Sequence, residues 1–333
     1  MISVLSDEKE ILSLLRKTLH PSTKDMLCFF SSQLNAFITD PVFMNVSIQD
    51  KMINRGYSVF DTTKVFGNKI YQLEKHIDRF LESTKRIYLK PKYSRSEIKT
   101  ILTQMAVLAR KVNPSDDIDL RYFYSGGIGN FNLKVENENN TFFAVAVRAN
   151  NLARPTNGVN EITVNVDKLK QELYCVKSTN YLINSIVQRK AQMEQTFMGI
   201  FTDDNGYLLE SPTNNIAFVL KDKTFCVPPF DKTLVGTTII RCFEHVQDKL
   251  ISKGLIKEIR RDYLTIEDVK KYASEVMLVG GDFIVPVLKI NDVEISDTPG
   301  EITRILQSFL TNDKTSESVC EEIPILIETE FMI

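Results

Sequence analysis

Lys177 is the residue whose position most clearly suggests chemistry. It ends a short apolar segment and directly precedes a helix predicted over residues 179–195. The positive end of a helix and partial burial both disfavour a charged amine. A neutral amine is the form that condenses with an aldehyde to give a Schiff base. Most lysines near a helix start are ordinary surface residues, so this position alone leaves both interpretations open.

Glu210 lies between two predicted strands, just before a turn that also contains Thr213. A carboxylate is costly to bury unless it meets a cation, and the protonated ring nitrogen of a heterocyclic cofactor is such a cation. An acid that keeps this nitrogen protonated makes the ring a strong electron sink. Glu210 and Thr213 are therefore candidate cofactor-binding residues. The alternative for Glu210 is an exposed acid in a turn.

Gly236, Thr237 and Thr238 end a loop and open a helix predicted over residues 237–253. Backbone N–H groups at a helix start attract anions, and a glycine there lets a phosphate come close. Arg79, on an earlier predicted helix, offers a guanidinium that binds phosphate through two nitrogens. Taken singly, an ordinary N-cap threonine and a solvated helix arginine are the alternatives.

The elements that must position these residues alternate between strands and helices. Apolar spacing and turn residues predict the first half as a hairpin over residues 57–73, helices over 74–85 and 95–112, and strands over 118–124 and 141–147. The second half is predicted as strands over residues 162–166, 197–202, 215–220, 275–279 and 285–290, with a last helix from residue 301. The 333 residues are enough for two domains. We expect these at residues 1–150 and 161–333, joined by a linker over 151–160 that is poor in apolar residues.

Composition argues against several other classes of protein. With 41 basic and 43 acidic residues the formal net charge is −2, so a nucleic-acid partner is not expected. The five cysteines are scattered and form no CxxC pair, which predicts neither a disulfide framework nor a zinc site. We expect no metal ion.

The N-terminal segment is predicted to be an amphipathic helix that contains several acidic residues. It lacks the apolar core of a signal peptide and the acid-poor composition of a transit peptide. No stretch reaches the roughly 20 apolar residues that a membrane span needs. We therefore expect a cytoplasmic protein without a membrane partner.

The order of the candidate residues resembles that of the class IV aminotransferases, the fold-type IV pyridoxal-phosphate enzymes. It runs from Arg79 through Lys177 and Glu210 to residues 236–238 and 275–287. The resemblance extends over residues 26–309. It is strongest to the plant-type group that includes D-amino-acid transaminase and aminodeoxychorismate lyase, through the stretches 50–62, 120–131 and 230–236.

The resemblance implies a role for each candidate residue. Lys177 would be the catalytic residue that holds pyridoxal 5'-phosphate as a Schiff base, and Glu210 would contact the pyridine nitrogen. Tyr181 would reach the ring hydroxyl, and Arg121 would lie near the substrate carboxylate. The implied phosphate site consists of Arg79, Gly236, Thr237, Thr238 and Gly281.

Three positions depart from the family pattern. Gly281 stands where the family commonly offers a threonine hydroxyl to the phosphate, which leaves only backbone donation at this position. The segment between Gly281 and Pro286 is one residue short, which would reshape the substrate side of the pocket. Gly126 stands where bacterial D-amino-acid transaminases place an arginine. The arginine that would bind the substrate carboxylate at this position is therefore absent.

The resemblance also implies an α+β fold and a homodimer. The fold would combine a smaller α/β N-terminal domain with a larger C-terminal domain that has a β-barrel-like sheet. We expect a transaminase acting on a small amino acid, of the D-amino-acid or branched-chain type, with a 2-oxo acid as acceptor. The alternatives are 4-amino-4-deoxychorismate lyase of folate biosynthesis, which forms 4-aminobenzoate and pyruvate, and a catalytically dead pyridoxal-phosphate-binding protein.

Overall fold

The computed structural model describes residues 2–149, 154–165 and 173–324. The chain divides into two compact units: unit 1 comprises Met1–Asn150 with Glu317–Ile333, and unit 2 comprises Asn151–Ser316. Residues from Glu317 onward group with unit 1 because strand β16 (Cys320–Glu322) pairs with β4 (Lys69–Tyr71). The division into domains at residues 150–160 stays a prediction. Within the described ranges, no helix has both the length and the hydropathy to cross a membrane.

Unit 1 is built on a seven-stranded sheet in the order β16-β4-β3-β5-β6-β1-β2. Its neighbouring strands are antiparallel throughout. The remaining strands are β1 (Met26–Ser31), β2 (Ala36–Ile38), β3 (Ser58–Phe66), β5 (Ile118–Ser125) and β6 (Thr141–Arg148). The predicted hairpin is present as β3 and β4, which are joined at Gly67 and Asn68. Gly67 has a positive φ of 54°, which a glycine adopts without strain.

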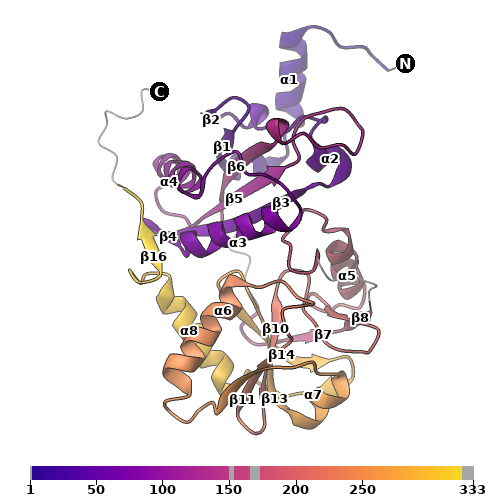
Figure 1. Cartoon of the computed structure of the whole chain (residues 1–333), viewed down its shortest axis with the longest axis vertical. Coiled ribbons are helices and arrows are strands. Elements are labelled where there is room, and N and C mark those ends of the chain that lie inside the picture. The colour runs from indigo at the N-terminus through magenta and orange to yellow at the C-terminus, as the bar shows by residue number, and fades with distance from the viewer. Residues whose placement is uncertain (1, 150–153, 166–172, 325–333) are drawn as a thin grey trace. The chain divides into compact units, whose positions relative to one another are not determined.

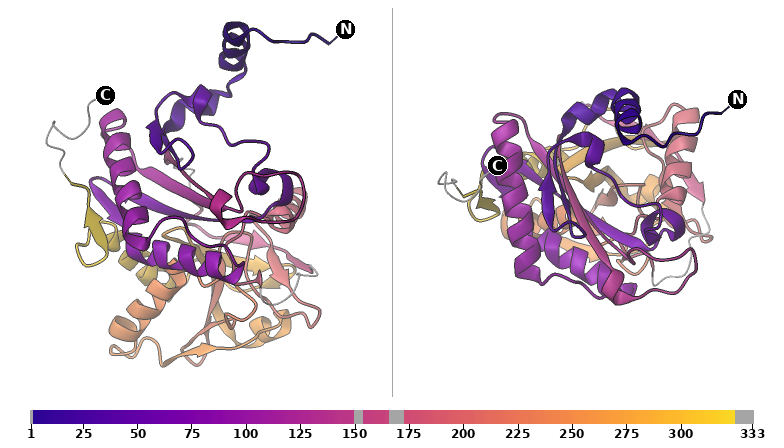
Figure 2. Two further views of the ribbon diagram at one scale, coloured as in Figure 1. Left: turned by 45° about the horizontal axis from the view of Figure 1, so that its top comes forward. Right: turned by 90° about the horizontal axis from the view of Figure 1, so that it is seen from above.

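Two helices, α3 (Leu73–Arg86) and α4 (Arg95–Val112), lie against one face of this sheet (Figures 1 and 2). Their apolar residues recur at helical spacing, which buries Phe80 of α3 and Leu102 and Met105 of α4 completely. The helices α1 (Glu8–Thr18) and α2 (Lys51–Arg55) are smaller, and α1 buries no residue. Among the described residues of unit 1, the two long helices therefore cover the same face of the sheet.

Unit 2 contains a second sheet in the order β12-β11-β10-β13-β14-β15, with β7 added to β14. The strands are β7 (Val159–Glu161), β10 (Asn215–Leu220), β11 (Thr224–Val227), β12 (Glu258–Arg261), β13 (Ala273–Gly280), β14 (Phe283–Ile290) and β15 (Val293–Glu294). A separate pair is formed by β8 (Thr163–Asn165) and β9 (Ile200–Thr202). The α+β class is confirmed. The expected barrel-like sheet is not: over the described residues the hydrogen-bonded order ends at β12 and β15, so the sheet stays open.

Both faces of this second sheet are covered. On one face α6 (Thr237–His245) and α8 (Glu301–Asp313) pack through Ile239, Leu306 and Leu310. On the other face β9 and α7 (Ile266–Tyr272) supply Ile200 and Val269. The remaining helix, α5 (Leu182–Met193), buries only Val187 and Ala191. A strand covered on both faces reads as a continuous apolar run, as residues 216–220 of β10 do.

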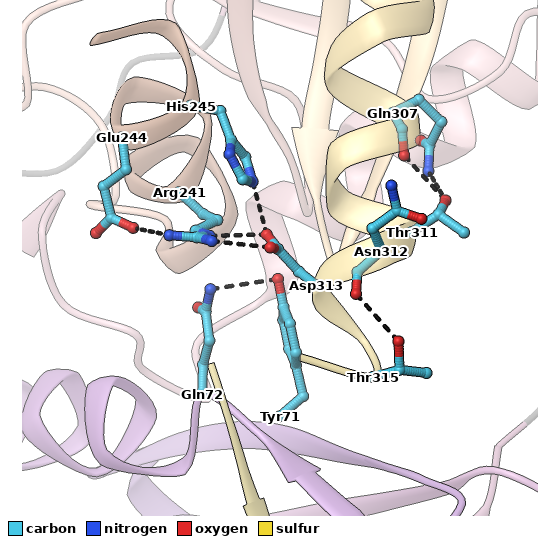
Figure 3. Close-up of polar contacts among 10 residues, drawn as sticks. All are labelled: Tyr71, Gln72, Arg241, Glu244, His245, Gln307, Thr311, Asn312, Asp313 and Thr315. Carbon is cyan, nitrogen blue, oxygen red and sulfur yellow. Dashed lines mark hydrogen bonds and ion pairs between the residues drawn. The ribbon is translucent and has the colours of Figure 1, made fainter. Parts of the chain in front are cut away.

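A buried ion pair joins α6 to α8 (Figure 3). Asp313, at the end of α8, accepts from Arg241 Nε at 2.7 Å and Nη2 at 2.8 Å, and its Oδ2 lies 2.7 Å from His245 Nε2. Burial alone would raise the pKa of Asp313, but the hydrogen bonds and charges of these two partners hold it well below its usual range. These contacts of Asp313 hold α6 against α8. Because α6 begins at Thr237, they also fix the helix that starts at this candidate site residue.

Replacing Asp313 with asparagine should destabilise the protein by about 3 kcal/mol, because it removes a buried carboxylate and leaves the partly buried Arg241 with the more exposed Glu244 as its countercharge. Denaturant unfolding at neutral pH measures this difference. Glu244→Gln is the matched control, since Glu244 accepts from the same arginine at 2.6 Å but is 35% exposed. Its cost should stay below about 1 kcal/mol.

The same pair predicts a dependence on pH. Because the folded-state pKa of Asp313 is depressed, the stability that it contributes is present above the ordinary aspartate pKa of about 3.9. This stability is lost as the pH falls below that value. The difference between the wild type and Asp313→Asn should therefore shrink between roughly pH 5 and pH 3. A difference that stays constant over this range would contradict the assignment.

Candidate active site

Lys177 lies in the segment before α5, partly buried, with its Nζ 3.3 Å from the hydroxyl of Tyr181. Tyr181 is the residue that directly precedes α5. The helix begins at Leu182, three residues later than predicted, because turns occupy the residues before it: Tyr181 N–H donates to Thr179 O, and Asn180 N–H donates to the hydroxyl of Ser178. The structure therefore brings the predicted lysine and the predicted tyrosine together.

Glu210 lies in an extended segment that pairs with β9 and forms an isolated bridge to Asn215. Its Oε2 accepts a hydrogen bond of 3.0 Å from the backbone N–H of Leu234. Leu234 belongs to the loop that leads into α6, so the acid is held against the loop that carries the predicted phosphate site. The sequence predicted the acid and the phosphate-binding helix start, but it did not predict the hydrogen bond between Glu210 and Leu234.

Asn215 fixes the same loop from β10. Its Nδ2 donates to Leu234 O at 2.7 Å, and a Cβ on Gly236 would lie only 2.1 Å from its Oδ1. Gly236 is therefore needed for this close approach. Gly236 is the N-cap of α6, so it lies at the positive end of the helix dipole. Gly236 thus leads directly into the start of α6, and the start of a helix is a favourable place for an anion.

The β13–β14 hairpin is attached to this helix start. Its two-residue turn consists of Gly281 and Asp282, which have φ values of 59° and 65°. Positive φ at both turn residues is typical of the tight type I′ hairpin, which accounts for the segment that is one residue short. The backbone N–H of Asp282 donates to the hydroxyl of Thr238 at 3.1 Å. Gly281 therefore lies beside the start of α6.

Two further hydrogen bonds tie the lysine segment into this arrangement. Cys175, two residues before Lys177, lies with its Sγ 2.8 Å from Phe230 O in the loop before α6. Asn184 of α5 donates to Pro212 O at 2.7 Å, in the turn after Glu210. Hydrogen bonds therefore link the amine, the acid and the helix start within unit 2.

Thr213 is placed differently from the other candidates of unit 2. Its side chain is exposed, and its hydroxyl lies 2.7 Å from Oδ1 of the neighbouring Asn214. The carbonyl of Thr213 crowds Gly280, where a Cβ would approach it to 2.9 Å. The described contacts of Thr213 are thus to its own turn, to the hairpin and to Met198, whose Sδ lies 3.5 Å from the Thr213 hydroxyl.

Arg79 lies in unit 1, on α3, and is held by a buried acid. Its Nε and Nη2 donate to the carboxylate of Asp61 at 2.8 and 2.6 Å, and His76 Nδ1 lies 2.9 Å from the same carboxylate. Burial alone would raise the pKa of Asp61, but the charges of Arg79 and His76 hold it well below its usual range. Asp61 is a functional candidate that the sequence prediction did not name. The sequence signal that could have identified Asp61 was the presence of an acidic residue among the apolar residues of a strand.

Arg121 faces away from this cluster. Asp61 and Tyr122 are paired, and Tyr122 packs against Phe80 of α3 with ring centroids 4.8 Å apart. Side chains alternate between the two faces along a strand, so Arg121 and its partner Thr62 point to the face opposite α3. Arg121 is exposed there. The two arginines predicted for the site thus lie on opposite faces of the sheet of unit 1.

Gly126 has no space for a longer side chain. A Cβ at this position would lie 2.6 Å from Cδ1 of Tyr57, whose hydroxyl donates to Ile87 O. An arginine here would have to displace this anchored ring. The glycine is therefore required by the packing of unit 1.

Residues 58–290 match the family described as Amino-transferase class IV. The D-amino-acid transaminase, chloroplastic, of Arabidopsis thaliana is 33% identical over 88% of this chain and 78% of the relative. The chain belongs to the class IV aminotransferases. A putative branched-chain-amino-acid aminotransferase of Methanocaldococcus jannaschii is 26% identical over 85% of this chain and 96% of the relative.

Solved structures of class IV aminotransferases share the fold. The branched-chain amino acid aminotransferase of Escherichia coli matches with a TM-score of 0.77 at 17% identity, covering 90% of this chain and all of the other. The T.th. branched-chain enzyme complexed with N-(5'-phosphopyridoxyl)-L-glutamate also gives 0.77, at 18% identity, over 90% of this chain and 99% of the other. Class IV aminotransferases depend on pyridoxal phosphate, so this chain is a pyridoxal-phosphate enzyme.

The residues of unit 2 fit this cofactor. Lys177 offers an amine to an aldehyde, and Glu210 offers a carboxylate to a protonated ring nitrogen. The bare Gly236 and the start of α6 offer backbone donors to a phosphate. The chemistry of this donor set thus matches the three functional groups of the class IV aminotransferase cofactor.

Proposed function

We propose that this class IV aminotransferase takes its amino group from a small amino acid, with D-amino acids as its first substrates, and passes it to a 2-oxo acid. The observation that carries the proposal is the hydrogen-bonded arrangement in unit 2. There Glu210 accepts from Leu234 N–H, and the segment of Lys177 is tied to the same loop through Cys175. An amine, an acid and an anion-binding helix start are thus held in one unit.

Lys177 has two tasks in this proposal. Pyridoxal phosphate, when bound, supplies an aldehyde for the amine and an electron sink for charge that develops at the substrate Cα. Lys177 supplies the amine that holds the aldehyde, and after its release the same amine is the base that moves the Cα proton. Tyr181, with its hydroxyl 3.3 Å from Nζ, is proposed to orient this amine and to reach the ring hydroxyl.

Glu210 is proposed to lie opposite the ring nitrogen. The N–H of Leu234 donates to its carboxylate and fixes its orientation. A fixed carboxylate keeps its partner nitrogen protonated without reorganising during the reaction.

The proposed phosphate ligands are the donors at the start of α6 and at the neighbouring hairpin. On unit 2 they comprise Gly236, Thr237, Thr238 and Gly281, and Arg79 is kept as a separate phosphate-ligand candidate from the sequence. Thr213 is kept as a further cofactor-binding candidate, and Arg121 is kept as the substrate-carboxylate candidate. The phosphate ligands fix orientation, which contributes to rate by holding the reacting atoms in place.

The chain's similarities favour transamination over the lyase reaction. None of the relatives and structures reported above is named as a lyase. The higher identity to the plant D-amino-acid transaminase, 33% against 26%, supports D-amino acids ahead of branched-chain ones. Any D-amino-acid carboxylate must be bound here without a side chain at position 126, because Tyr57 occupies that space.

The test presents the purified protein separately with D-alanine, L-leucine and aminodeoxychorismate, with 2-oxoglutarate as acceptor for the two amino acids. Keto acid from D-alanine, and none from L-alanine as the chirality control, is the expected result. Keto acid from L-leucine alone would move the assignment to a branched-chain enzyme. Pyruvate with 4-aminobenzoate, and no keto acid from either amino acid, would overturn transamination in favour of the lyase.

A homodimer and a cytoplasmic location are further parts of the proposal. Size-exclusion chromatography with light scattering should give twice the chain mass of 38.1 kDa. A monomer with full activity would contradict the dimer. The Arabidopsis relative is named as chloroplastic, so fractionation of the source cells must decide between an organelle and the cytoplasm.

A further inference from the structure

The tip of the β13–β14 hairpin carries a guanidinium beside the start of α6. Arg154 Nη1 donates to Gly281 O at 2.7 Å, and its guanidinium lies over the ring of Phe283, 5.0 Å from the centroid. The same tip is joined to α6 by the hydrogen bond from Asp282 N–H to Thr238. A single two-residue turn therefore connects Arg154 to the proposed phosphate site, and all of these residues belong to unit 2.

The space in front of Gly281 is open except for this arginine. A Cβ at Gly281 would have one neighbouring atom within 4 Å, Arg154 Nη2 at 3.8 Å. Gly281 is exposed, and among the described residues its backbone N–H has no acceptor. Arg154 itself is 34% exposed, so its remaining N–H groups are accessible. An open backbone donor and an accessible guanidinium thus occur together at one turn.

Arg154 is not needed as the main countercharge of its acidic neighbour. Asp282 is 3% exposed, and Lys314 Nζ lies 2.7 Å from its Oδ2, whereas Arg154 Nη2 lies 3.5 Å from its Oδ1. The nearer ammonium pairs with the carboxylate at hydrogen-bond distance. Asp282 thus has a cation at hydrogen-bond distance without Arg154.

We propose that Arg154 is a ligand of the cofactor phosphate and supplies the side-chain donor that Gly281 lacks. This inference rests on the proposed function, because it assigns a further residue to the same phosphate site. A guanidinium binds phosphate oxygens through two parallel hydrogen bonds, which a threonine hydroxyl cannot do. The loss of a hydroxyl at position 281 is thus compensated by a residue more than one hundred positions earlier in the chain.

A substrate carboxylate is also an oxyanion that a guanidinium binds. The phosphate is favoured because the hairpin that holds Arg154 is hydrogen-bonded to Thr238 at the helix start. The two anions are separated experimentally by comparing pyridoxal phosphate with pyridoxal, which has the same ring and aldehyde but no phosphate.

The experiment titrates the apoenzymes of wild type, Arg154→Gln and Arg154→Lys with each of the two compounds. In Arg154→Gln the dissociation constant for pyridoxal phosphate should rise about 10- to 100-fold, the effect of losing a charge-assisted bidentate pair. Binding of pyridoxal should be little changed. Arg154→Lys should bind pyridoxal phosphate more tightly than Arg154→Gln but less tightly than wild type. Lysine keeps the positive charge but lacks the paired N–H donors of the guanidinium.

Lys314→Gln is the matched control, because it removes the other cation from Asp282 without touching the proposed phosphate ligands. Its affinity for pyridoxal phosphate should stay close to that of wild type. An equal loss in Lys314→Gln, or an equal loss of pyridoxal and pyridoxal phosphate in Arg154→Gln, would show that the hairpin has merely loosened and would overturn the proposal. Thermal unfolding checks that each variant folds, and Arg154→Lys carries the test if Arg154→Gln does not.

Two further results separate this inference from the proposed function. Unchanged cofactor affinity with a raised KM for the amino donor would assign Arg154 to the substrate carboxylate and overturn the phosphate role. A wild-type protein that binds neither compound would overturn the proposed function itself, and the assignment of Arg154 with it. Wild-type binding that does not distinguish the two compounds would overturn only the phosphate role.

Discussion

Replacing Lys177 with alanine should lower the rate of transamination by at least about 10³-fold. The variant loses both the amine that holds the cofactor and the base that moves the Cα proton. Single-turnover conversion of bound cofactor by D-alanine measures the loss directly. Reduction of the wild-type holoenzyme with borohydride, followed by peptide mapping, should place the pyridoxyl label on Lys177, and the variant should carry none.

Lys190→Ala is the control for this experiment. Lys190 lies on α5, thirteen positions further along the chain, and is exposed. It should keep full turnover and the label on Lys177. A label found on any other lysine of the wild type, or turnover in Lys177→Ala within tenfold of the wild type, would remove the basis of the proposed mechanism.

Glu210→Gln should reduce kcat by about 10²- to 10³-fold, the usual effect of removing one fixed electrostatic partner of a reacting system. A neutral amide no longer favours a protonated ring nitrogen, so the electron sink is weaker. Glutamine keeps an oxygen that accepts from Leu234 N–H, so the loop before α6 should stay in place. The free energy of unfolding should therefore change by no more than about 1 kcal/mol.

The size of the kcat effect distinguishes an electronic role from a structural one. Glu194→Gln changes an exposed acid at the end of α5 and should leave kcat unaltered. An unchanged kcat in Glu210→Gln would refute the ring-nitrogen role. So would a loss that appeared only as weaker cofactor binding, since the charge would then serve to hold the cofactor and not to activate it.

Local sequence signals were sufficient for much of the fold. The predicted helix over residues 95–112 is present as α4 with the same ends, because Ser94 and Glu97 form a capping box at its start. The strand β10, with its apolar run over residues 216–220, was also placed at its observed bounds. In both cases the deciding interactions lie within a few residues of one another or follow from a continuous apolar run.

The sequence did not predict elements that are stabilised by segments far away along the chain. The strand β12 has the sequence Glu-Ile-Arg-Arg, which shows no apolar alternation, and it forms because it pairs in parallel with β11. The predicted helix over residues 237–253 ends as α6 at His245 and continues as a π-helical turn over Val246–Leu250. The barrel-like sheet was also not found, since closure depends on how the edge strands pair, which no local pattern encodes.

Residue type and order along the chain were enough to identify the family and to propose the chemical groups of the site: an amine at Lys177, an acid at Glu210 and a glycine-threonine helix start at residues 236–238. The partners that hold these groups emerged from the three-dimensional fold alone. The contact of Glu210 with Leu234, of Asn215 with the same loop, and of Arg154 with the turn at Gly281 join residues 19 to 127 positions apart. Hydrogen bonds depend on distance and direction in space, and folding sets both.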